Sequence, residues 1–262
     1  MDANLTDKVA FVTGGGSGIG EGACYALARA GAAVAVVDVR EQPATAVADR
    51  IQAEGGRALA AVADVGDEQQ MSAAVARTVA AFGGLHIVFA NAGINGMQCP
   101  IEEMTLDEWH ATMNTNLTGS FLSVKHSIPH LRAAGGGSII ITSSVNGTRL
   151  FGLPGYACYS TSKAGQVAFA KMAAIELARW GIRVNVILPG GVRTHIAERT
   201  YRRNLEPITY GMGLPASFPP LYGRPASPDE IANLVVFLAS DDSSYMTGAE
   251  IVIDAAATLL RG

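Results

Sequence analysis

The chain is poor in cysteine, in charge and in basic residues, and each shortage excludes a class of protein. Three cysteines, Cys24, Cys99 and Cys158, lie far apart, which excludes a disulfide framework and shows no zinc motif. Lysine and arginine total 19 against 23 aspartates and glutamates, so the net charge of -4 offers no basic surface for nucleic acid.

The sequence also has no long apolar run. None reaches the roughly 18 residues that cross a bilayer, and the N-terminus is polar and unlike a signal peptide. The histidines and carboxylates show no spacing typical of a metal site. We therefore expect a cytoplasmic protein with no metal, no membrane partner and no nucleic-acid partner. A chain of 262 residues can bury a large core without disulfides.

What the sequence does contain is a regular alternation of short apolar runs and longer helical patterns. The runs are almost wholly apolar, as in strands buried on both faces of a parallel sheet. Repeated strand–helix–strand units predict one α/β domain over residues 1–262, a doubly wound Rossmann fold with seven parallel strands in the order 3-2-1-4-5-6-7. The predicted strands are Val9–Thr13, Ala33–Asp38, Ala58–Asp64, His86–Ala90, Ser138–Thr142, Arg183–Leu188 and Glu250–Ile253.

Helix start signals and one irregular stretch complete the pattern. Asp67 with Gln70, Thr105 with Glu108, and Ser227-Pro228 with Glu230 resemble N-terminal caps. The stretch from about 193 to 226 is too long and irregular for an ordinary connection, and its residues 193–224 contain four prolines and scattered aromatics. Because this stretch follows a strand's carboxyl end, we expect a substrate-binding lid. Four of its arginines could recognise an acidic substrate, but they are interpreted as a solvated helical face; they are Arg193, Arg199, Arg202 and Arg203.

The first strand runs into a glycine-rich loop. Gly14, Ser17, Gly18 and Gly20 stand between that strand and a helical pattern. Glycines let a pyrophosphate approach main-chain N–H groups, and the helix N-terminus adds partial positive charge. This context predicts a dinucleotide site. Asp38, which ends the second strand, can accept hydrogen bonds from ribose hydroxyls and would repel a 2′-phosphate, which favours NAD over NADP, although Arg40 could pair with that phosphate.

Tyr159 and Lys163 are spaced i and i+4, so they share one face of a helix. An ammonium about 4 Å from the phenol, at an effective dielectric of about 20, would lower the phenol pKa by up to about three units. Tyr159 could then act as the general acid and base for an alcohol and a ketone. A hydroxyl of Ser143-Ser144, at the end of a strand, could bond the substrate oxygen. Asn116 could hold a water or orient Lys163.

Together these motifs resemble a classical short-chain dehydrogenase/reductase. The resemblance covers nearly the whole chain and implies a tetrad of Asn116, Ser144, Tyr159 and Lys163, a nicotinamide cofactor, an alcohol or ketone substrate, and a homotetramer or homodimer. It also implies that Lys163 binds the nicotinamide ribose and that Tyr159 lies at the cofactor. The matching motifs are Thr13-Gly14-x-x-x-Gly18-x-Gly20, Asn91-Ala92-Gly93, Asn116, Ser144, Tyr159-x-x-x-Lys163 and Pro189-Gly190-x-Val192-x-Thr194. The cofactor contacts that it implies further include Ile19 at the pyrophosphate, Asp64 and Val65 at the adenine, and Val192 and Thr194 at the carboxamide.

Three departures from the family pattern stand out. Ala90 replaces an asparagine common before Asn91, and the chain ends in Asp254-Ala255-Ala256-Ala257 without the usual glycines. The stretch from Ser144 to Tyr159 is about two residues longer than usual, which leaves Ser143 and Ser144 both open as the catalytic serine. Two other functions stay open: an NADPH-dependent reductase of 3-oxoacyl thioesters, and an NAD-binding regulatory protein without turnover.

Overall fold

The computed structural model describes residues 4–151, 153–209 and 221–260. Seven strands form one sheet: β1 Val9–Thr13, β2 Ala33–Asp38, β3 Arg57–Val62, β4 Ile87–Ala90, β6 Gly137–Thr142, β7 Ile182–Pro189 and β9 Glu250–Ile253. Their order is β3-β2-β1-β4-β6-β7-β9, and every pairing is parallel. Numbered along the chain, the seven strands have the order 3-2-1-4-5-6-7. The predicted doubly wound Rossmann sheet is confirmed, with strand ends within two residues of those expected.

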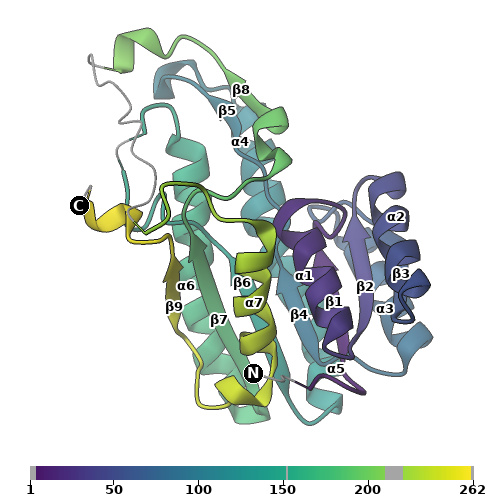
Figure 1. Ribbon diagram of the computed structural model, residues 1–262. Coiled ribbons are helices and arrows are strands. Elements are labelled where there is room, and N and C mark those ends of the chain that lie inside the picture. Colours follow the sequence, from purple (N-terminus) through teal and green to yellow (C-terminus); the bar gives the residue numbers. More distant parts are fainter. Residues whose placement is uncertain (1–3, 152, 210–220, 261–262) are drawn as a thin grey trace.

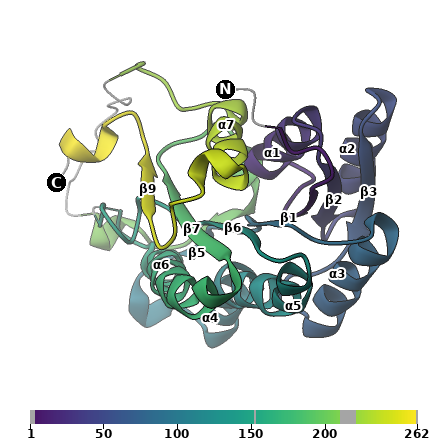
Figure 2. The same cartoon turned by 90° about the horizontal axis from the view of Figure 1, so that it is seen from below.

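The strands are mostly apolar because both faces of the sheet are covered. In β1, Val9 and Phe11 pack into one core and Ala10 and Val12 into the other. Figure 2 shows α1, α2 and α7 on one side of the sheet and α3, α5 and α6 on the other. The helices are α1 Gly18–Arg29, α2 Glu41–Ala53, α3 Glu68–Phe82, α4 Leu106–Met113, α5 Gly119–Ala133, α6 Ala157–Leu177 and α7 Pro228–Ala239. No helix within the described ranges is long and apolar enough to cross a membrane.

The predicted helix starts are confirmed. The Asp67 carboxylate accepts from the backbone N–H of Gln70 at 2.9 Å. Both Thr105 with Glu108 and Ser227 with Glu230 form complete capping boxes, in which side chain and backbone satisfy one another in both directions. These caps fix where α3, α4 and α7 begin.

Two features were not expected from the sequence. A second sheet pairs β5 Gly96–Gln98 with β8 Thr200–Arg202 in parallel, and Figure 1 shows it with α4 at one end of the molecule. A π-helical turn, η2 Asn114–Thr118, joins α4 to α5. The fold thus places extra structure beyond the carboxyl edge of the main sheet.

The segment predicted as a lid is only partly helical. It holds two 3₁₀ turns, His195–Arg199 and Glu206–Ile208, on either side of β8. The expected solvated helical face is wrong, because Arg202 lies in a strand and Arg203 makes partly buried ion pairs. Residues 210–220, with three of the four prolines, lie outside the described residues. The Arg193 N–H donates to the Ala226 carbonyl at 2.9 Å, so the first and last residues of the segment lie next to each other.

Candidate active site

Helix α6 carries a tyrosine and a lysine on one face at the carboxyl edge of the sheet. Lys163 is 3% exposed, and its Nζ lies 5.6 Å from the centroid of the Tyr159 ring. The same Nζ donates to the carbonyl of Thr142, the last residue of β6, at 2.9 Å. The predicted convergence of these groups is therefore present, with the ammonium held against the end of a strand.

The two serines after β6 have different surroundings. Ser143 is buried, and its Oγ donates to the backbone carbonyl of Lys163 at 2.7 Å. Ser144 is partly exposed, and its hydroxyl lies near enough to the Tyr159 phenol to lower the pKa of that phenol. Ser144 also accepts from the Asn146 N–H at 3.1 Å. The geometry thus favours Ser144 over Ser143 as the hydroxyl that can meet a substrate oxygen.

The electrostatics of the pair differ from the expectation. Burial raises the pKa of Tyr159 to about 12, and the nearby Ser144 hydroxyl only partly opposes that effect. Burial also lowers the pKa of Lys163 to about 7. The expected lowering of the phenol pKa is wrong, because it assumed a fully charged ammonium 4 Å away and took no account of burial. The protein's own groups leave Tyr159 protonated at neutral pH.

Asn116 is fully buried in the π-helical turn. Its Oδ1 accepts from the Ile94 N–H at 2.8 Å. Its Nδ2 donates to the Ile94 carbonyl at 3.0 Å and to the Ser162 hydroxyl at 2.9 Å. Both amide hydrogens are therefore used, and the side chain does not bond Lys163. A methyl group added at Gly93 would lie 3.3 Å from Asn116 Oδ1 and 3.4 Å from Lys163 Nζ, so Gly93 lies next to both side chains.

The glycine-rich loop has the shape that a phosphate site needs. Gly14 and Gly18 have φ of +65° and +57°, where glycine is favoured. A methyl group at Gly20 would lie 2.1 Å from the Gly14 carbonyl oxygen, so this position excludes every side chain. Ser17 caps α1 without a side-chain hydrogen bond to the helix, and Ile19 lies in the first turn. The N–H groups that open α1 fit a pyrophosphate.

Asp38 ends β2 next to this loop and is 6% exposed. Its carboxylate accepts from the Gly16 N–H at 3.2 Å and from the Arg40 N–H at 3.0 Å. The Arg40 guanidinium pairs with the same carboxylate at 3.3 Å and donates to the Ser17 hydroxyl at 3.0 Å. Asp38, which favours NAD, and Arg40, which could bind the 2′-phosphate of NADP, thus form an ion pair next to the glycine-rich loop.

The remaining predicted cofactor positions line the same edge. Asn91 donates from Nδ2 to the Thr13 carbonyl and accepts from the Thr142 hydroxyl, both at 3.1 Å. The Ala92 N–H donates to the Thr13 hydroxyl at 3.2 Å. These contacts tie the ends of β1, β4 and β6 together. Thr142 was missed as a site residue, and its place at a predicted strand end was the signal that could have found it.

The predicted positions after β3 and β7 also reach this edge. After β3, Asp64 is exposed and Val65 is buried against Gly119. After β7, the Gly190 N–H donates to the Ile253 carbonyl at 3.0 Å, which anchors the Pro189–Gly190 turn.

Beyond that turn, the chain passes back over the glycine-rich loop. Val192 forms a bridge with Ala226. A methyl group at Gly18 would lie 3.0 Å from Thr194 Cγ2, so the start of the lid segment meets the phosphate-binding loop.

Three segments far apart in the sequence meet next to the start of α6, the helix that carries Tyr159. Arg203 follows β8 and donates its N–H to the Gln98 carbonyl of β5 at 3.0 Å. A methyl group at Gly155, just before α6, would lie 2.6 Å from Leu205 Cδ2 and 3.3 Å from the Cys99 N–H nitrogen. The loop after β4, the loop before α6 and the lid segment therefore meet.

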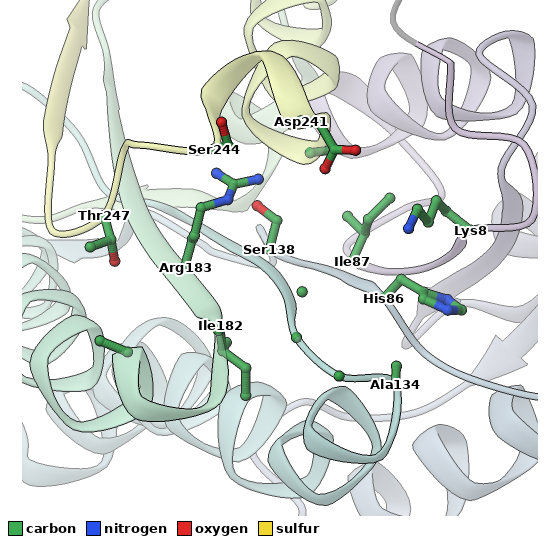
Figure 3. Close-up of a pocket in the computed structure, with 16 residues that line it drawn as sticks. Lys8, His86, Ile87, Ala134, Ser138, Ile182, Arg183, Asp241, Ser244 and Thr247 are labelled. Atoms are coloured by element: carbon green, nitrogen blue, oxygen red, sulfur yellow. The ribbon is translucent and has the colours of Figure 1, made fainter.

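A cavity of about 470 Å³ lies at the opposite edge of the sheet, at the amino ends of β4, β6 and β7. Figure 3 shows Lys8, His86, Arg183 and Asp241 around it. The Arg183 guanidinium donates to the Leu238 carbonyl at 2.9 Å and so caps the end of α7. None of the predicted site residues lines this cavity, so it is distinct from the constellation around Tyr159.

Comparison with known proteins agrees with this geometry. The family model described as enoyl-(acyl carrier protein) reductase matches residues 14–258. The chain is 38% identical over 261 residues to cyclohexanol dehydrogenase of Acinetobacter sp. (strain SE19), covering 98% of each chain. It is 39% identical over 254 residues to a 3-alpha-(or 20-beta)-hydroxysteroid dehydrogenase of Mycobacterium tuberculosis, covering 97% of this chain and 90% of that one.

A solved structure of a 3-ketoacyl-ACP reductase from Sinorhizobium meliloti superposes with a TM-score of 0.92 at 40% identity, covering 97% of this chain and 100% of that one. Fold, motifs and relatives agree across nearly the whole length. The chain therefore belongs to the classical short-chain dehydrogenase/reductase family and is an oxidoreductase that interconverts alcohols and ketones with a nicotinamide cofactor.

Proposed function

We propose that this enzyme is an NAD-dependent dehydrogenase of a cyclic secondary alcohol, with Tyr159 as the general acid and base. The observation that carries the proposal is the Lys163 amine, which is bonded to the Thr142 carbonyl and lies 5.6 Å from the centre of the Tyr159 ring, with the Ser144 hydroxyl near enough to the same phenol to lower its pKa. These three groups can bind an alcohol oxygen and remove its proton. The relatives named for cyclohexanol and hydroxysteroids support a ring-shaped substrate.

Each of the four residues has a distinct task in this proposal. Ser144 donates to the substrate oxygen and holds it against the phenol. Tyr159 removes the hydroxyl proton during oxidation and returns it during reduction. Lys163, in its ammonium form, stabilises the phenolate and binds the nicotinamide ribose. Asn116 holds the turn against which Gly93 and Lys163 pack. The oxidised nicotinamide ring, when bound, accepts the hydride.

Asp38 supports NAD as the cofactor. A buried carboxylate at the end of β2 can accept hydrogen bonds from ribose hydroxyls and would repel a 2′-phosphate. Arg40 does not act against this preference, because its guanidinium is paired with Asp38 at 3.3 Å. The proposed cofactor site comprises Gly14, Ser17, Gly18, Ile19, Gly20, Asp38, Asp64, Val65, Asn91, Ala92, Gly93, Tyr159, Lys163, Pro189, Gly190, Val192 and Thr194.

The single domain, residues 1–262, would close its site with the segment 193–226. Thr194 meets Gly18 at the cofactor end, and Leu205 meets Gly155 beside the helix of Tyr159. A segment anchored at both places can exclude water from the reaction. We place the substrate between this segment and the loop that precedes α6.

We further propose a cytoplasmic homotetramer or homodimer. Helices α5 and α6 expose Phe121, Met172 and Ile175, at 43%, 64% and 74% of their surfaces. A second copy of the chain, packing its own α5 and α6 on this face, would remove those side chains from water. Light scattering during gel filtration measures the mass, and a monomer at micromolar concentration would contradict the assembly.

The test is turnover of a matched substrate panel. Purified enzyme is mixed with NAD or NADP and with cyclohexanol, a 3-hydroxysteroid or a linear secondary alcohol, and the absorbance of the reduced cofactor is followed. We expect the cyclic alcohols with NAD to give the highest kcat/KM. The similarity to the 3-ketoacyl-ACP reductase supports a second candidate, which predicts faster reduction of a 3-oxoacyl thioester with NADPH. NAD binding without turnover of any substrate would favour a regulatory protein.

A further inference from the structure

One polar side chain on the catalytic face of α6 has no part in the proposed chemistry. Tyr159, Ser162, Lys163 and Gln166 stand at i, i+3, i+4 and i+7, so they follow one stripe of the helix. Gln166 is completely buried. Its position one turn beyond Lys163 places it against the π-helical turn that carries Asn116.

The Gln166 amide bonds this turn directly. Its Nε2 donates to the backbone carbonyl of Asn116 at 2.8 Å and to the Ser120 hydroxyl at 2.7 Å. The Ser120 hydroxyl in turn donates to the same Asn116 carbonyl at 2.8 Å. The three groups form a closed ring of hydrogen bonds, which fixes the orientation of the amide because a reversed amide would place two oxygens face to face.

The ring stands behind the groups that pack on the amine. The Asn116 side chain hydrogen-bonds the Ile94 backbone and the Ser162 hydroxyl. The Ser162 hydroxyl also donates to the Tyr159 carbonyl at 2.7 Å. Gly93 lies next to both side chains, since a methyl group added there would lie 3.3 Å from Asn116 Oδ1 and 3.4 Å from Lys163 Nζ. A shift of the Asn116 backbone would therefore be passed to both the lysine and the tyrosine.

The other end of the amide shows that packing alone does not explain this residue. Gln166 Oε1 is buried and has no hydrogen-bond partner within the described part of the chain. A buried acceptor without a donor costs free energy that an apolar side chain of the same shape would avoid. The two hydrogen bonds that Nε2 donates offset this cost, and an apolar side chain could not make them.

We propose that Gln166 is a positioning residue for the hydride-transfer reaction, which clamps the Asn116 carbonyl and so holds the π-helical turn against Lys163 and Tyr159. The inference rests on the proposed roles of Asn116, Tyr159 and Lys163. Gln166 touches neither substrate nor cofactor in this account. Its effect belongs to the geometry of the chemical step and not to binding.

The experiment replaces the amide by a thioether of similar length. In Gln166→Met we expect kcat for cyclohexanol oxidation to fall by at least about tenfold, because small misplacements of reacting groups slow chemistry steeply. The dissociation constant for NAD should change less than about twofold. The kinetic isotope effect with cyclohexanol deuterated at the carbinol carbon should rise, since hydride transfer becomes slower than product release. Loss of folded protein alone would lower activity and leave the isotope effect unchanged.

A second variant keeps the test decisive if Gln166→Met folds poorly. Ser120→Ala removes one member of the ring, and Ser123→Ala is its matched control, because Ser123 is equally buried on α5 and bonds only its own helix, at the Gly119 carbonyl. We expect Ser120→Ala, but not Ser123→Ala, to raise the isotope effect and to speed hydrogen exchange of the amides in Asn114–Thr118.

Two results overturn the proposal. One is a folded Gln166→Met enzyme with unchanged kcat, isotope effect and exchange in the turn. The other is a Ser120→Ala enzyme that cannot be distinguished from Ser123→Ala in isotope effect and exchange. The exchange measurement needs no substrate, so it tests Gln166 even if cyclohexanol is not turned over. Activity that survives Tyr159→Phe would instead refute the proposed function.

Discussion

The Lys163 amine donates a 2.9 Å hydrogen bond to the carbonyl of Thr142, and the Ser143 hydroxyl returns a 2.7 Å bond to the carbonyl of Lys163. Helix α6 and the end of strand β6 are thus fastened to each other from both sides. Because Tyr159 stands one turn before Lys163 and Ser144 directly follows Ser143, this fastening sets the distance between the phenol and the serine hydroxyl. The site is built on two rigid elements, and no mobile loop is needed to align it.

The first prediction concerns the proton. Tyr159→Phe removes only the phenolic oxygen, so we expect NAD binding to stay within about twofold and kcat to fall by roughly 10² to 10⁴, the usual contribution of an acid–base group. Tyr156→Phe is the matched control, because the two rings touch edge to face with centroids 5.7 Å apart. Fluorescence titration with NADH and steady-state kinetics measure both effects. Robust turnover by Tyr159→Phe would mean that another residue carries the proton.

The second prediction concerns pH. With a Tyr159 pKa of about 12, the phenol is protonated across the neutral range, so oxidation, which needs the phenolate, should accelerate as pH rises from 7 to 10. Ketone reduction needs the protonated phenol and should show no such rise. Lys163, with a pKa of about 7, loses its charge over the same range and flattens the oxidation profile. Single-turnover rates in both directions give the profiles. An oxidation rate that is constant over this range would argue against Tyr159 as base.

Much of this architecture follows from local patterns, and what escaped prediction depends on contacts between distant segments. Short stretches of sequence are enough to predict the apolar strands, the helix caps and the pairing of Tyr159 with Lys163 on one helix face. The pairing of β5 with β8 is not, because each strand has only three residues and Gly96–Gln98 carries no apolar run. Which of Ser143 and Ser144 faces Tyr159 depends on how the chain leaves β6. The pKa of Tyr159 depends on burial, which residue spacing does not reveal.

The third prediction concerns cofactor choice. Asp38→Ala removes the carboxylate that would bond the ribose hydroxyls, so we expect the dissociation constant for NAD to rise about tenfold or more, since hydrogen bonds to charged groups contribute about 1.5–3 kcal/mol. Affinity for NADP should fall less or improve, because Arg40 would be released from its 3.3 Å pair with Asp38. Asp49→Ala, on the exposed side of α2, is the control. Titration of each variant with NAD and with NADP measures both dissociation constants. An unchanged ratio of the two constants in Asp38→Ala would show that Asp38 does not determine cofactor choice.

The last prediction concerns the proposed lid, whose described part is anchored by Arg203. This guanidinium donates to both carboxylate oxygens of Glu108, at 2.8 and 3.1 Å, and lies 3.6 Å from the Glu103 carboxylate. The same contact holds the pKa of Glu108 down at about 2, so the pair stays charged at any working pH. Because β8 directly precedes Arg203, the anchor also keeps β8 paired with β5.

Arg203→Ala should therefore loosen the contacts of the lid segment with β5 and with the loop before α6, without touching the phosphate-binding loop. We expect KM for the alcohol to rise about tenfold and the dissociation constant for NAD to stay unchanged, because misplaced positioning groups weaken productive substrate binding. Glu108→Gln should shift KM in the same direction, and Arg199→Ala, exposed in the same segment, should not. Limited proteolysis should cut the segment 193–226 faster in Arg203→Ala than in Arg199→Ala. Equal KM values and equal cleavage rates would show that this segment does not form the substrate wall.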